Sequence, residues 1–332
     1  MNVSIIIPTK NRASILEETV SNIYDKQKYP LNSFEVIIVN DGDNLPENLT
    51  QRYPNLIIIK NKGKGAASAR NTGAQAAKNE LLLFIDDDIL IGETCIEKHI
   101  ALHAQYPRSL ISGSRQYNPD ILPIFKNIPF GRYLLMHDYK TKENDYQVQN
   151  AGTNKKTDNI YSPASLASFN LSILTKDFKE IGGFNESFPF AGCEDQELTL
   201  KVKGMGFQLL FDTSNLNLDN DKHVIVMKKW LARQYTGVQG FVLLCELFPF
   251  RKEERLYYEN TPVNKSDSFN LKVKKTIKQL LSGNIPLSVL VNLTFLLENL
   301  KVKDSTLFSL YNMLCGLYLN KGFRHAYKTL KN

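Results

Sequence analysis

Four short apolar runs in the first 115 residues constrain the fold of this 332-residue chain more than any other feature. Their Val, Ile and Leu content is typical of strands that are covered on both faces. The runs span residues 3–7, 34–39, 56–60 and 81–85, and helical patterns lie between them at 13–26 and 66–78. Strands that alternate with helices predict an α/β fold built on a parallel, doubly wound sheet.

Polar residues follow each of the four runs. They are Pro8-Thr9-Lys10-Asn11-Arg12, Asn40-Asp41-Gly42, Asn61-Lys62-Gly63-Lys64-Gly65 and Asp86-Asp87-Asp88. Ligands of doubly wound sheets bind at the carboxyl ends of the strands. We therefore expect these amides, glycines, cations and carboxylates to meet at one edge of the sheet and to line a ligand site.

The pattern is less regular after residue 115. Prolines and tyrosines without a clear period predict an irregular insertion over 115–162. We expect a strand at 165–174, a helix that begins near Glu194 and a further strand at 207–211. After residue 223 the chain is predicted to be mainly helical.

The composition excludes several classes of protein. With 42% hydrophobic, 10% aromatic and 23% charged residues, the chain is an ordinary globular protein and not collagen, a coiled coil or a disordered chain. The four cysteines lie far apart without a C-x-x-C pair, which argues against a zinc knuckle or a disulfide framework. The N-terminal apolar run is too short for a signal peptide, so we expect a reducing, cytoplasmic setting.

The positive charge is concentrated near the C-terminus. Residues 250–332 hold 14 lysines and arginines against 6 acidic residues, a net charge of +8, whereas the remainder holds 27 against 28. This distribution does not fit a nucleic-acid-binding core, but it fits contact with anionic lipid or an anionic acceptor. A solvated, lysine-rich helical subdomain explains it equally well.

Apolar segments accompany this charge. Lys272, Lys274, Lys275 and Lys278 precede them, as in an interfacial helix. Packing of the helices against the rest of the protein predicts the same pattern. The longest apolar stretches, 287–297 and 307–319, are shorter than the roughly 20 residues that a membrane-spanning helix needs.

Three consecutive carboxylates, Asp86 to Asp88, follow the fourth strand. Their mutual repulsion has to be offset by positive charge. Mg²⁺ and Mn²⁺ suit carboxylate oxygens and are often held by one or two carboxylates together with phosphates of a ligand. Asp86 and Asp88 are therefore candidate metal ligands, and the alternative is a solvated acidic loop or a helix cap.

A glycine-rich turn precedes the second helical pattern. Gly63, Gly65 and the small residues after them allow an anion to approach the free N–H groups at the start of a helix. Arg70, one turn later, adds a charged fork. The turn lacks the G-K-[ST] ending of a P-loop, and a tight connection without a ligand is the alternative.

Glu194 and Asp195 form a second acidic pair, far along the chain from the first. A carboxylate beside a metal-bound diphosphate can accept the proton of an attacking hydroxyl. Acidic residues in the first turn of a helix also complement its dipole without any catalytic role. His223 is a candidate third metal ligand, since imidazole binds Mn²⁺, and a surface histidine is the alternative.

Taken together, these segments resemble the family 2 glycosyltransferases of GT-A fold. The matching stretches, in the order of the family, are Ser4 to Thr9, Glu35 to Gly42, Gly65 to Gly73, Phe84 to Asp88, and Gly182 to Glu186 followed by Glu194-Asp195. The resemblance implies a Rossmann-like, doubly wound mixed sheet with a mainly helical C-terminal region. It also implies a catalytic domain at 1–225, with a nucleotide-binding half at 1–115 and an acceptor-binding half at 116–225, and a basic helical region at 226–332.

The resemblance assigns roles to individual residues. Residues implied to bind the nucleotide-sugar are Pro8, Thr9, Asn11, Arg12, Asp41, Gly65, Arg70, Asp86 and Asp87. Asp41 matches the aspartate that bonds the base, typically uracil, and Asp86 and Asp88 match the carboxylates that meet the ribose and the Mn²⁺ or Mg²⁺ ion. Asp195 matches the catalytic base of inverting members, with Glu194 supporting the acceptor or the helix start.

The segment from Gly182 to Asp195 also looks like the corresponding part of animal galactosyltransferases, in which a later histidine binds the metal. His223 follows Asp195 at a similar spacing, so the resemblance implies that it is a ligand here. The sequence Ala191-Gly192-Cys193 departs from the tryptophan-containing turn of that group.

The resemblance predicts an inverting, metal-dependent glycosyltransferase of cell-surface polysaccharide or glycoconjugate synthesis. Its donor would be a nucleotide-sugar, with UDP-sugars favoured, and its acceptor a glycan, a lipid-linked glycan or a protein. We expect no nucleic-acid partner, and a peripheral position at the inner face of a membrane fits the basic tail. The alternatives are a sugar nucleotidyltransferase, whose glycine-rich signature after the first strand is missing, and a non-catalytic carbohydrate- or membrane-binding protein on the same scaffold.

Overall fold

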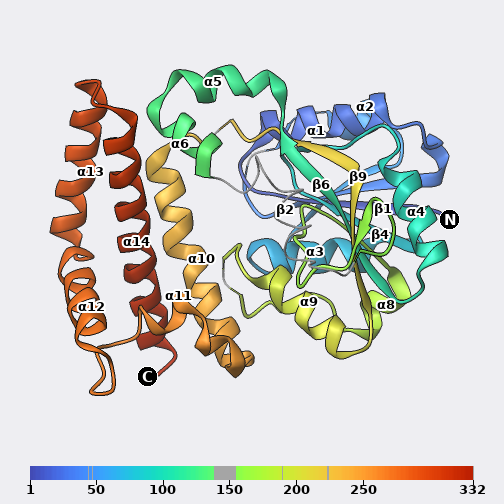
Figure 1. The fold of residues 1–332 in the computed structure, drawn as a ribbon. Helices are drawn as coiled ribbons and strands as arrows, with labels where there is room; N and C mark the ends of the chain where they lie inside the picture. Colours follow the sequence, from blue (N-terminus) through green and yellow to red (C-terminus); the bar gives the residue numbers. More distant parts are fainter. Residues whose placement is uncertain (44, 47, 138–154, 189, 223, 332) are drawn as a thin grey trace. The chain divides into compact units, whose positions relative to one another are not determined.

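The computed structural model describes residues 1–331 except 44, 47, 138–154, 189 and 223. The described residues form two compact units (Figure 1). The first, here called the sheet unit, comprises described residues of 1–121, 155–188 and 194–221. The second, the helical unit, comprises 122–137, 190–193 and the described residues of 222–331.

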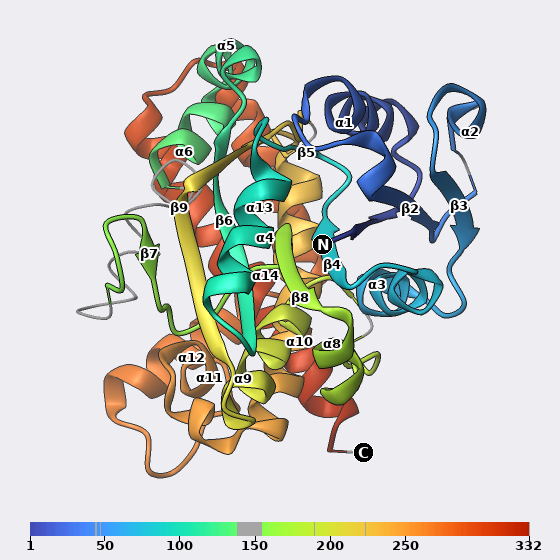
Figure 2. The ribbon, with the colours of Figure 1, turned by 90° about the vertical axis from the view of Figure 1, so that its right-hand side faces the viewer.

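The sheet unit contains one mixed sheet (Figure 2). Its strands are β1 (Val3–Thr9), β2 (Phe34–Asn40), β3 (Leu56–Lys60), β4 (Leu81–Ile85), β5 (Ile89–Leu90), β6 (Ser109–Tyr117), β7 (Ile160–Tyr161), β8 (Asn170–Leu174) and β9 (Gln208–Asp219). The order is β3-β2-β1-β4-β8-β6-β9-β5, with β7 paired to β9. The first four strands are parallel, whereas β8 runs antiparallel to both β4 and β6. The predicted α/β class with a doubly wound mixed sheet is confirmed.

Helices cover both faces of this sheet. They are α1 (Ala13–Lys26), α2 (Leu49–Arg52), α3 (Gly65–Ala76), α4 (Cys95–Gln105), α8 (Thr175–Glu180) and α9 (Glu194–Gly204). Alternate strand residues point to opposite faces. Ile6, Ile37 and Phe84 therefore pack with α3, α8 and α9, while their neighbours Ile5 and Leu83 pack with α1 and α4. This double burial explains why the parallel strands are continuous apolar runs.

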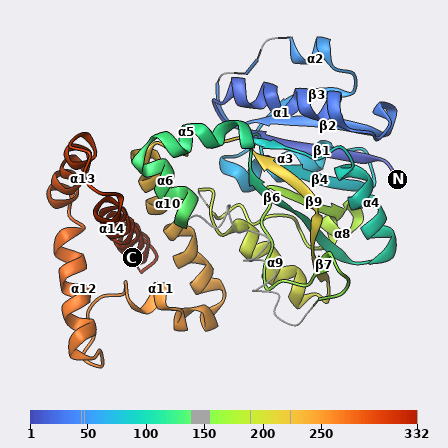
Figure 3. The same ribbon diagram turned by 45° about the horizontal axis from the view of Figure 1, so that its top comes forward.

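The helical unit consists of α5 (Leu122–Asn127), α6 (Pro129–His137), α10 (Met227–Leu247), α11 (Arg255–Tyr258), α12 (Phe269–Leu281), α13 (Asn284–Asn299) and α14 (Asp304–Thr329). The long helix α14 contacts α6, α10, α12 and α13, and Figure 3 shows it between α10 and the α12–α13 pair. Short 3₁₀ segments lie at Leu31–Ser33, Pro119–Ile121 and Pro249–Glu253.

Of the sequence expectations for 115–221, the irregular insertion is wrong and the two strands are present with different bounds. The predicted irregular insertion contains the end of β6 and the helices α5 and α6, because Phe130 and Tyr133 of α6 pack against Trp230 and Tyr311. Such long-range aromatic contacts leave no local period to read. The strand expected at 165–174 is confined to β8, and the one expected at 207–211 extends to Asp219 as β9. The part of the insertion at 138–154 lies outside the described residues.

In the described part of the chain, no single helix has both the length and the hydropathy to cross a membrane. Helices α12 and α13 meet that criterion only when they are taken together, and they are bent by 81° at their junction.

Candidate active site

Asp41 directly follows β2, and its carboxylate reaches the start of α3, where the sequence predicted the approach of an anion. Asn61 Nδ2 donates a hydrogen bond to Asp41 Oδ1 (2.7 Å), and Lys10 Nζ and the Gly65 N–H donate to Oδ2 (3.1 and 3.2 Å). Burial alone would raise the pKa of Asp41, but these hydrogen bonds outweigh it and hold the pKa below its usual value. Gly65 has a φ of +83°, which favours glycine at this turn.

Asn11 contacts the loop after β2. Its backbone is in the left-handed region with a φ of +55°, which asparagine tolerates better than most residues. Its Oδ1 accepts a hydrogen bond from the Asp43 N–H (2.8 Å), and a Cβ at Gly42 would collide with this side chain. Asn11 thus fixes the turn after β1 against the turn after β2.

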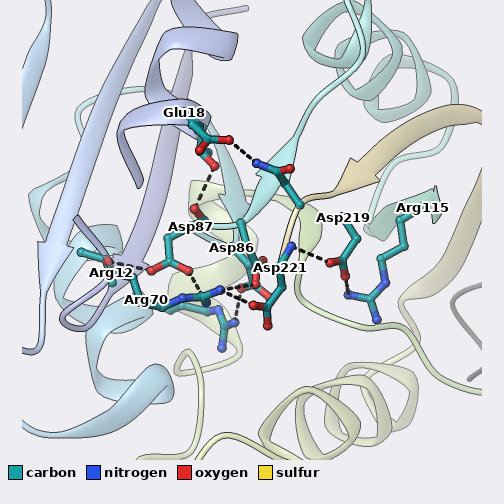
Figure 4. A network of polar contacts seen from close by, with 12 residues as sticks. Arg12, Glu18, Arg70, Asp86, Asp87, Arg115, Asp219 and Asp221 are labelled. Carbon is teal, nitrogen blue, oxygen red and sulfur yellow. Dashed lines mark hydrogen bonds and ion pairs between the residues drawn. The ribbon is translucent and has the colours of Figure 1, made fainter. Parts of the chain in front are cut away.

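Arg12 joins two acidic segments that are far apart in the sequence (Figure 4). Its Nη1 contacts Asp87 Oδ1 at 2.7 Å, and its Nη2 contacts Asp88 Oδ2 at 2.8 Å and Asp221 Oδ1 at 3.3 Å. Burial alone would lower the pKa of Arg12, but the three carboxylates outweigh it and raise the pKa. Arg12 is therefore charged at any physiological pH.

The three consecutive aspartates differ in their surroundings. Asp87 is buried, and Thr9 Oγ1 donates to its second oxygen at 2.6 Å, so both of its carboxylate oxygens are bonded within the protein. Asp86 is the most exposed of the three, with 34% of its side chain accessible. Burial raises the pKa of Asp87, and burial together with the charge of Asp219 raises that of Asp88.

Arg70 brings the two acidic motifs together. Its Nη2 contacts Asp86 Oδ1 at 2.8 Å and its Nη1 contacts Glu194 Oε1 at 3.1 Å, although Arg70 and Glu194 are 124 residues apart in the sequence. Arg70 is only 3% exposed, its guanidinium lies over the Phe184 ring at 5.4 Å, and its Nε has no hydrogen-bond partner among the described residues. The carboxylates of both motifs therefore meet at one buried cation.

Asp195 follows Glu194 in the first turn of α9. Its Oδ1 accepts a hydrogen bond from the Gln196 N–H (2.8 Å). Burial and the neighbouring charge of Glu194 raise the pKa of Asp195, against the opposing effect of Arg70. A carboxyl group with a raised pKa is suited to accept a proton near neutral pH.

The structure brings most of the predicted site residues to the edge formed by the ends of β1, β2 and β4. Thr9 and Pro8 end β1, and the Asp41 N–H donates to the Thr9 carbonyl (2.9 Å). The arginines Arg12 and Arg70 do not extend into solvent as isolated cations; both are held by carboxylates. His223 lies outside the described residues.

Sequence reasoning missed the roles of the acidic residues at the end of β9 and directly after it, Asp219 and Asp221. Asp221 contacts Arg12, and Asp219, which pairs in register with Ile89, lies 3.7 Å from Arg115. The Asn220 N–H donates to the Asp88 carbonyl (2.8 Å). An Asp-Asn-Asp run after a strand repeats the pattern of the Asp86–Asp88 run, and this similarity was the available signal.

The chemistry of these residues fits a hard divalent cation. Asp87, Asp88, Asp219 and Asp221 supply four carboxylates against the two guanidinium groups of Arg12 and Arg115, so this network has a charge of −2 when all are ionised. Oxygen ligands suit Mg²⁺ and Mn²⁺, for which one or two carboxylates plus phosphates suffice. Among the described residues no three His, Cys, Asp or Glu side chains converge as a complete metal-binding group.

Comparison with known proteins agrees with this architecture. Residues 4–162 match the family described as glycosyl transferase family 2. Validoxylamine A glucosyltransferase of Streptomyces hygroscopicus subsp. jinggangensis is 27% identical over 230 residues, which cover 62% of this chain and 52% of that protein. Poly(ribitol-phosphate) beta-N-acetylglucosaminyltransferase TarP of Staphylococcus aureus is 24% identical over 266 residues, which cover 74% of this chain and 71% of that protein. The chain therefore spans about half the length of the first of these relatives.

A solved structure matches over nearly the whole chain. It is the mannosyltransferase PcManGT from Pyrobaculum calidifontis in complex with GDP-Man and Mn²⁺, with a TM-score of 0.58 at 16% identity, and the match covers 96% of this chain and 86% of that one. This likeness concerns the fold. The chain thus has the GT-A fold, and the sequence match identifies residues 4–162 as a glycosyl transferase family 2 domain.

Proposed function

We propose that this protein is an inverting glycosyltransferase that moves a sugar from a nucleotide-sugar to an acceptor hydroxyl. The observation that carries the proposal is the bridge of Arg70 between Asp86 and Glu194. It holds an acidic motif suited to the donor beside an acidic motif suited to the acceptor. We assign donor binding to residues 1–115, acceptor binding to 116–225, and a supporting role to 226–332.

The donor side of the proposed site is formed by the loops after β1, β2 and β4. Asp41 bonds the base, and a UDP-sugar is the expected donor, although PcManGT was solved with GDP-Man. Asp86 and Asp88 would hold Mn²⁺ or Mg²⁺, with His223 as a third ligand. When bound, the ion neutralises charge that develops on the leaving diphosphate.

Asp195 is the proposed catalytic base. Its raised pKa allows it to take the proton of the acceptor hydroxyl, whose oxygen then attacks the anomeric carbon. The bond from that carbon to the diphosphate oxygen breaks on the opposite face, so the product has inverted configuration. Glu194, neutralised by Arg70, fixes the start of α9 and thereby the position of Asp195.

The Asp195→Asn variant tests this role. We expect turnover to fall about 10³-fold, within the usual contribution of a general base, while binding of the nucleoside diphosphate stays unchanged. Transfer would be measured with a panel of nucleotide-sugars and acceptors, and nucleotide binding by calorimetry.

Glu197→Gln, two residues later on α9, is the matched control and should keep most of the activity, because Glu197 lies near Lys201 (3.9 Å) and not at Arg70. Comparable turnover in Asp195→Asn would remove Asp195 from the base role. Formation of a nucleotide-sugar from a sugar 1-phosphate and a nucleoside triphosphate would support the nucleotidyltransferase alternative. Absence of any nucleotide binding would support a non-catalytic scaffold.

We further propose that the helical unit contacts a lipid surface, where lipid-linked acceptors are found. Exposed apolar side chains form a stripe along each of two helices, with Phe269 and Ile285 both 79% exposed. The stripe comprises Phe269, Val273, Ile277 and Leu280 on α12 and Ile285, Val289, Leu293 and Leu296 on α13. Contiguous exposed apolar surface of this kind is typical of interaction sites.

The lysines of α12 contribute less to this surface than the sequence suggested. Lys275 is 2% exposed and contacts Asp267 at 2.8 Å, and Lys274 and Lys278 contact Glu259 at 2.7 and 3.5 Å. Their ammonium groups are therefore held by carboxylates of the helical unit, although two carboxylates offset only part of the positive charge. The apolar stripe, more than these lysines, would provide the lipid contact.

Sedimentation with vesicles tests the proposal. We expect the protein to sediment with vesicles that contain phosphatidylglycerol at low salt, and the Ile285→Ser/Val289→Ser variant to lose most of this binding. Leu31→Ser, an exposed apolar position in the sheet unit, is the control. A protein that stays in the supernatant under all these conditions would contradict the lipid contact.

A further inference from the structure

Arg12 has a position that its implied role in nucleotide binding does not explain. It is the residue before α1, its side chain is 24% exposed, and this side chain makes no hydrogen bond that would cap α1. Its guanidinium instead contacts carboxylates from two loops, those of Asp87 and Asp88 after β4 and that of Asp221 after β9. Figure 4 shows Arg12, Asp87 and Asp221 around the same centre.

The two Arg12 nitrogens contact different carboxylates. Nη1 is bonded to Asp87, whose other oxygen is bonded to Thr9, so this half of the fork belongs to a buried, fully bonded contact. Nη2 is shared between Asp88 (2.8 Å) and Asp221 (3.3 Å). One positively charged nitrogen thus occupies the point where two carboxylate oxygens converge, as a metal ion would.

We propose that Arg12 is the internal counter-ion of the divalent-cation site at Asp88, and that a cation competes with its Nη2 for the carboxylates of Asp88 and Asp221. The inference rests on the cation dependence in the proposed function. It adds that in the cation-free protein the Arg12 guanidinium holds the carboxylates of Asp88 and Asp221 together. When the ion binds, the guanidinium loses part of these contacts. The contact of Nη1 with Asp87 keeps Arg12 in place during this exchange.

If Arg12 competes with the cation, removing its guanidinium changes the cation affinity in one direction; if Arg12 only supports the structure of the site, the change has the opposite sign. If Arg12 and the cation share the same oxygens, removal of the guanidinium must increase the cation affinity, since the coupling between two ligands of one site is reciprocal. If Arg12 only orders the two loops, its removal must loosen the site and decrease that affinity. The sign of the change therefore distinguishes the two.

The experiment is a titration of the full-length protein with Mn²⁺ in the absence of any donor, followed by the electron paramagnetic resonance signal of free Mn²⁺. We expect Arg12→Gln to bind Mn²⁺ about tenfold more tightly than the unmodified protein, which corresponds to about 1.4 kcal/mol. Mn²⁺ should also raise the melting temperature of Arg12→Gln more than that of the unmodified protein. Arg12→Lys keeps the charge without the fork and should be intermediate.

Arg108→Gln is the matched control, because Arg108 is an arginine of the sheet unit that pairs with Glu180 on the surface. Its Mn²⁺ affinity should not change. Should Arg12→Gln fail to fold, Arg12→Lys carries the same test with a smaller effect. Equal or weaker Mn²⁺ binding by the folded variants overturns the proposal, as does an absence of binding. Sugar transfer in the presence of a chelator would refute cation dependence of the reaction, and the titration would decide the role of Arg12 separately.

Discussion

At the scale of single residues, a buried histidine pair on α4 stands out beside the charged site. His99 Nδ1 and His103 Nε2 both lie within hydrogen-bond distance of Ser172 Oγ (2.7 and 2.8 Å), and His99 Nε2 lies 2.7 Å from Asn170 Oδ1. Burial lowers the pKa of His99 to about 4 and, with repulsion from His99, that of His103 to about 3. The folded protein therefore holds both histidines neutral.

This pair predicts a loss of stability in weak acid. An unfolded histidine takes up a proton near pH 6.5, whereas the folded pair resists it, so stability is full above pH 6.5 and falls as the pH approaches 4. The loss amounts to as much as about 3 kcal/mol for His99. Urea unfolding of His99→Gln between pH 7 and pH 4 should show a shallower decrease than the unmodified protein. His325→Gln, an exposed position, is the control, and an identical slope in all three proteins would contradict the prediction.

Individual residues also show how much of the candidate site could be predicted from the sequence. The positions of Asp41, Asp86 and Gly65 followed from the rule that polar residues after parallel strands share one edge. The bond between Arg70 and Glu194 did not, because no local pattern links residues 124 positions apart. Arg70 was therefore read as a ligand contact, whereas in the structure it joins the two acidic motifs.

At the scale of elements, strands were predicted better than the helices of the second unit. The runs at 3–7, 34–39, 56–60 and 81–85 became β1 to β4 because double burial leaves an uninterrupted apolar pattern. Helix α6 was missed because its aromatic residues are selected by partners on α10 and α14. Its Arg132 is likewise fixed by Asp304 of α14, at 2.6 and 2.7 Å.

The structure predicts opposite effects of a glycine-to-alanine substitution on the free energy of unfolding at two positions of α14. A Cβ at Gly322 would collide with the backbone carbonyl of Tyr235 on α10, which cannot rotate away, while a Cβ at Gly316 would meet nothing within 4 Å. Gly322→Ala should lower the free energy of unfolding by about 1–3 kcal/mol through overpacking. Gly316→Ala should raise it by about 0.5–1 kcal/mol through helix propensity. Thermal and urea unfolding would measure both, and equal effects would contradict the close approach of α10 and α14.

At the scale of the whole molecule, the structure shows how the charges counted from the sequence are arranged in ion pairs. The excess of positive charge lies in residues 250–332, yet Glu259 alone contacts Arg255, Lys274 and Lys278. Burial would raise the pKa of Glu259, but these partners outweigh it and lower the pKa to about 2. One carboxylate offsets one of these three positive charges, so the cluster keeps a net charge of +2. The pairing fixes where the cations lie, and the net charge of the region remains as counted from the sequence.

The helical unit is discontinuous in sequence, and this has a consequence for the order in which the chain becomes structured during synthesis. Helices α5 and α6 leave the ribosome about 190 residues before the end of α14, on which α6 packs. At the usual rate of about 5–20 residues per second, they wait on the order of 10 to 40 s for this partner. Strand β6 waits in the same way for β9, which pairs with it along its whole length. The apolar faces of α6 and β6 are thus the surfaces of the nascent chain that a chaperone would have to protect.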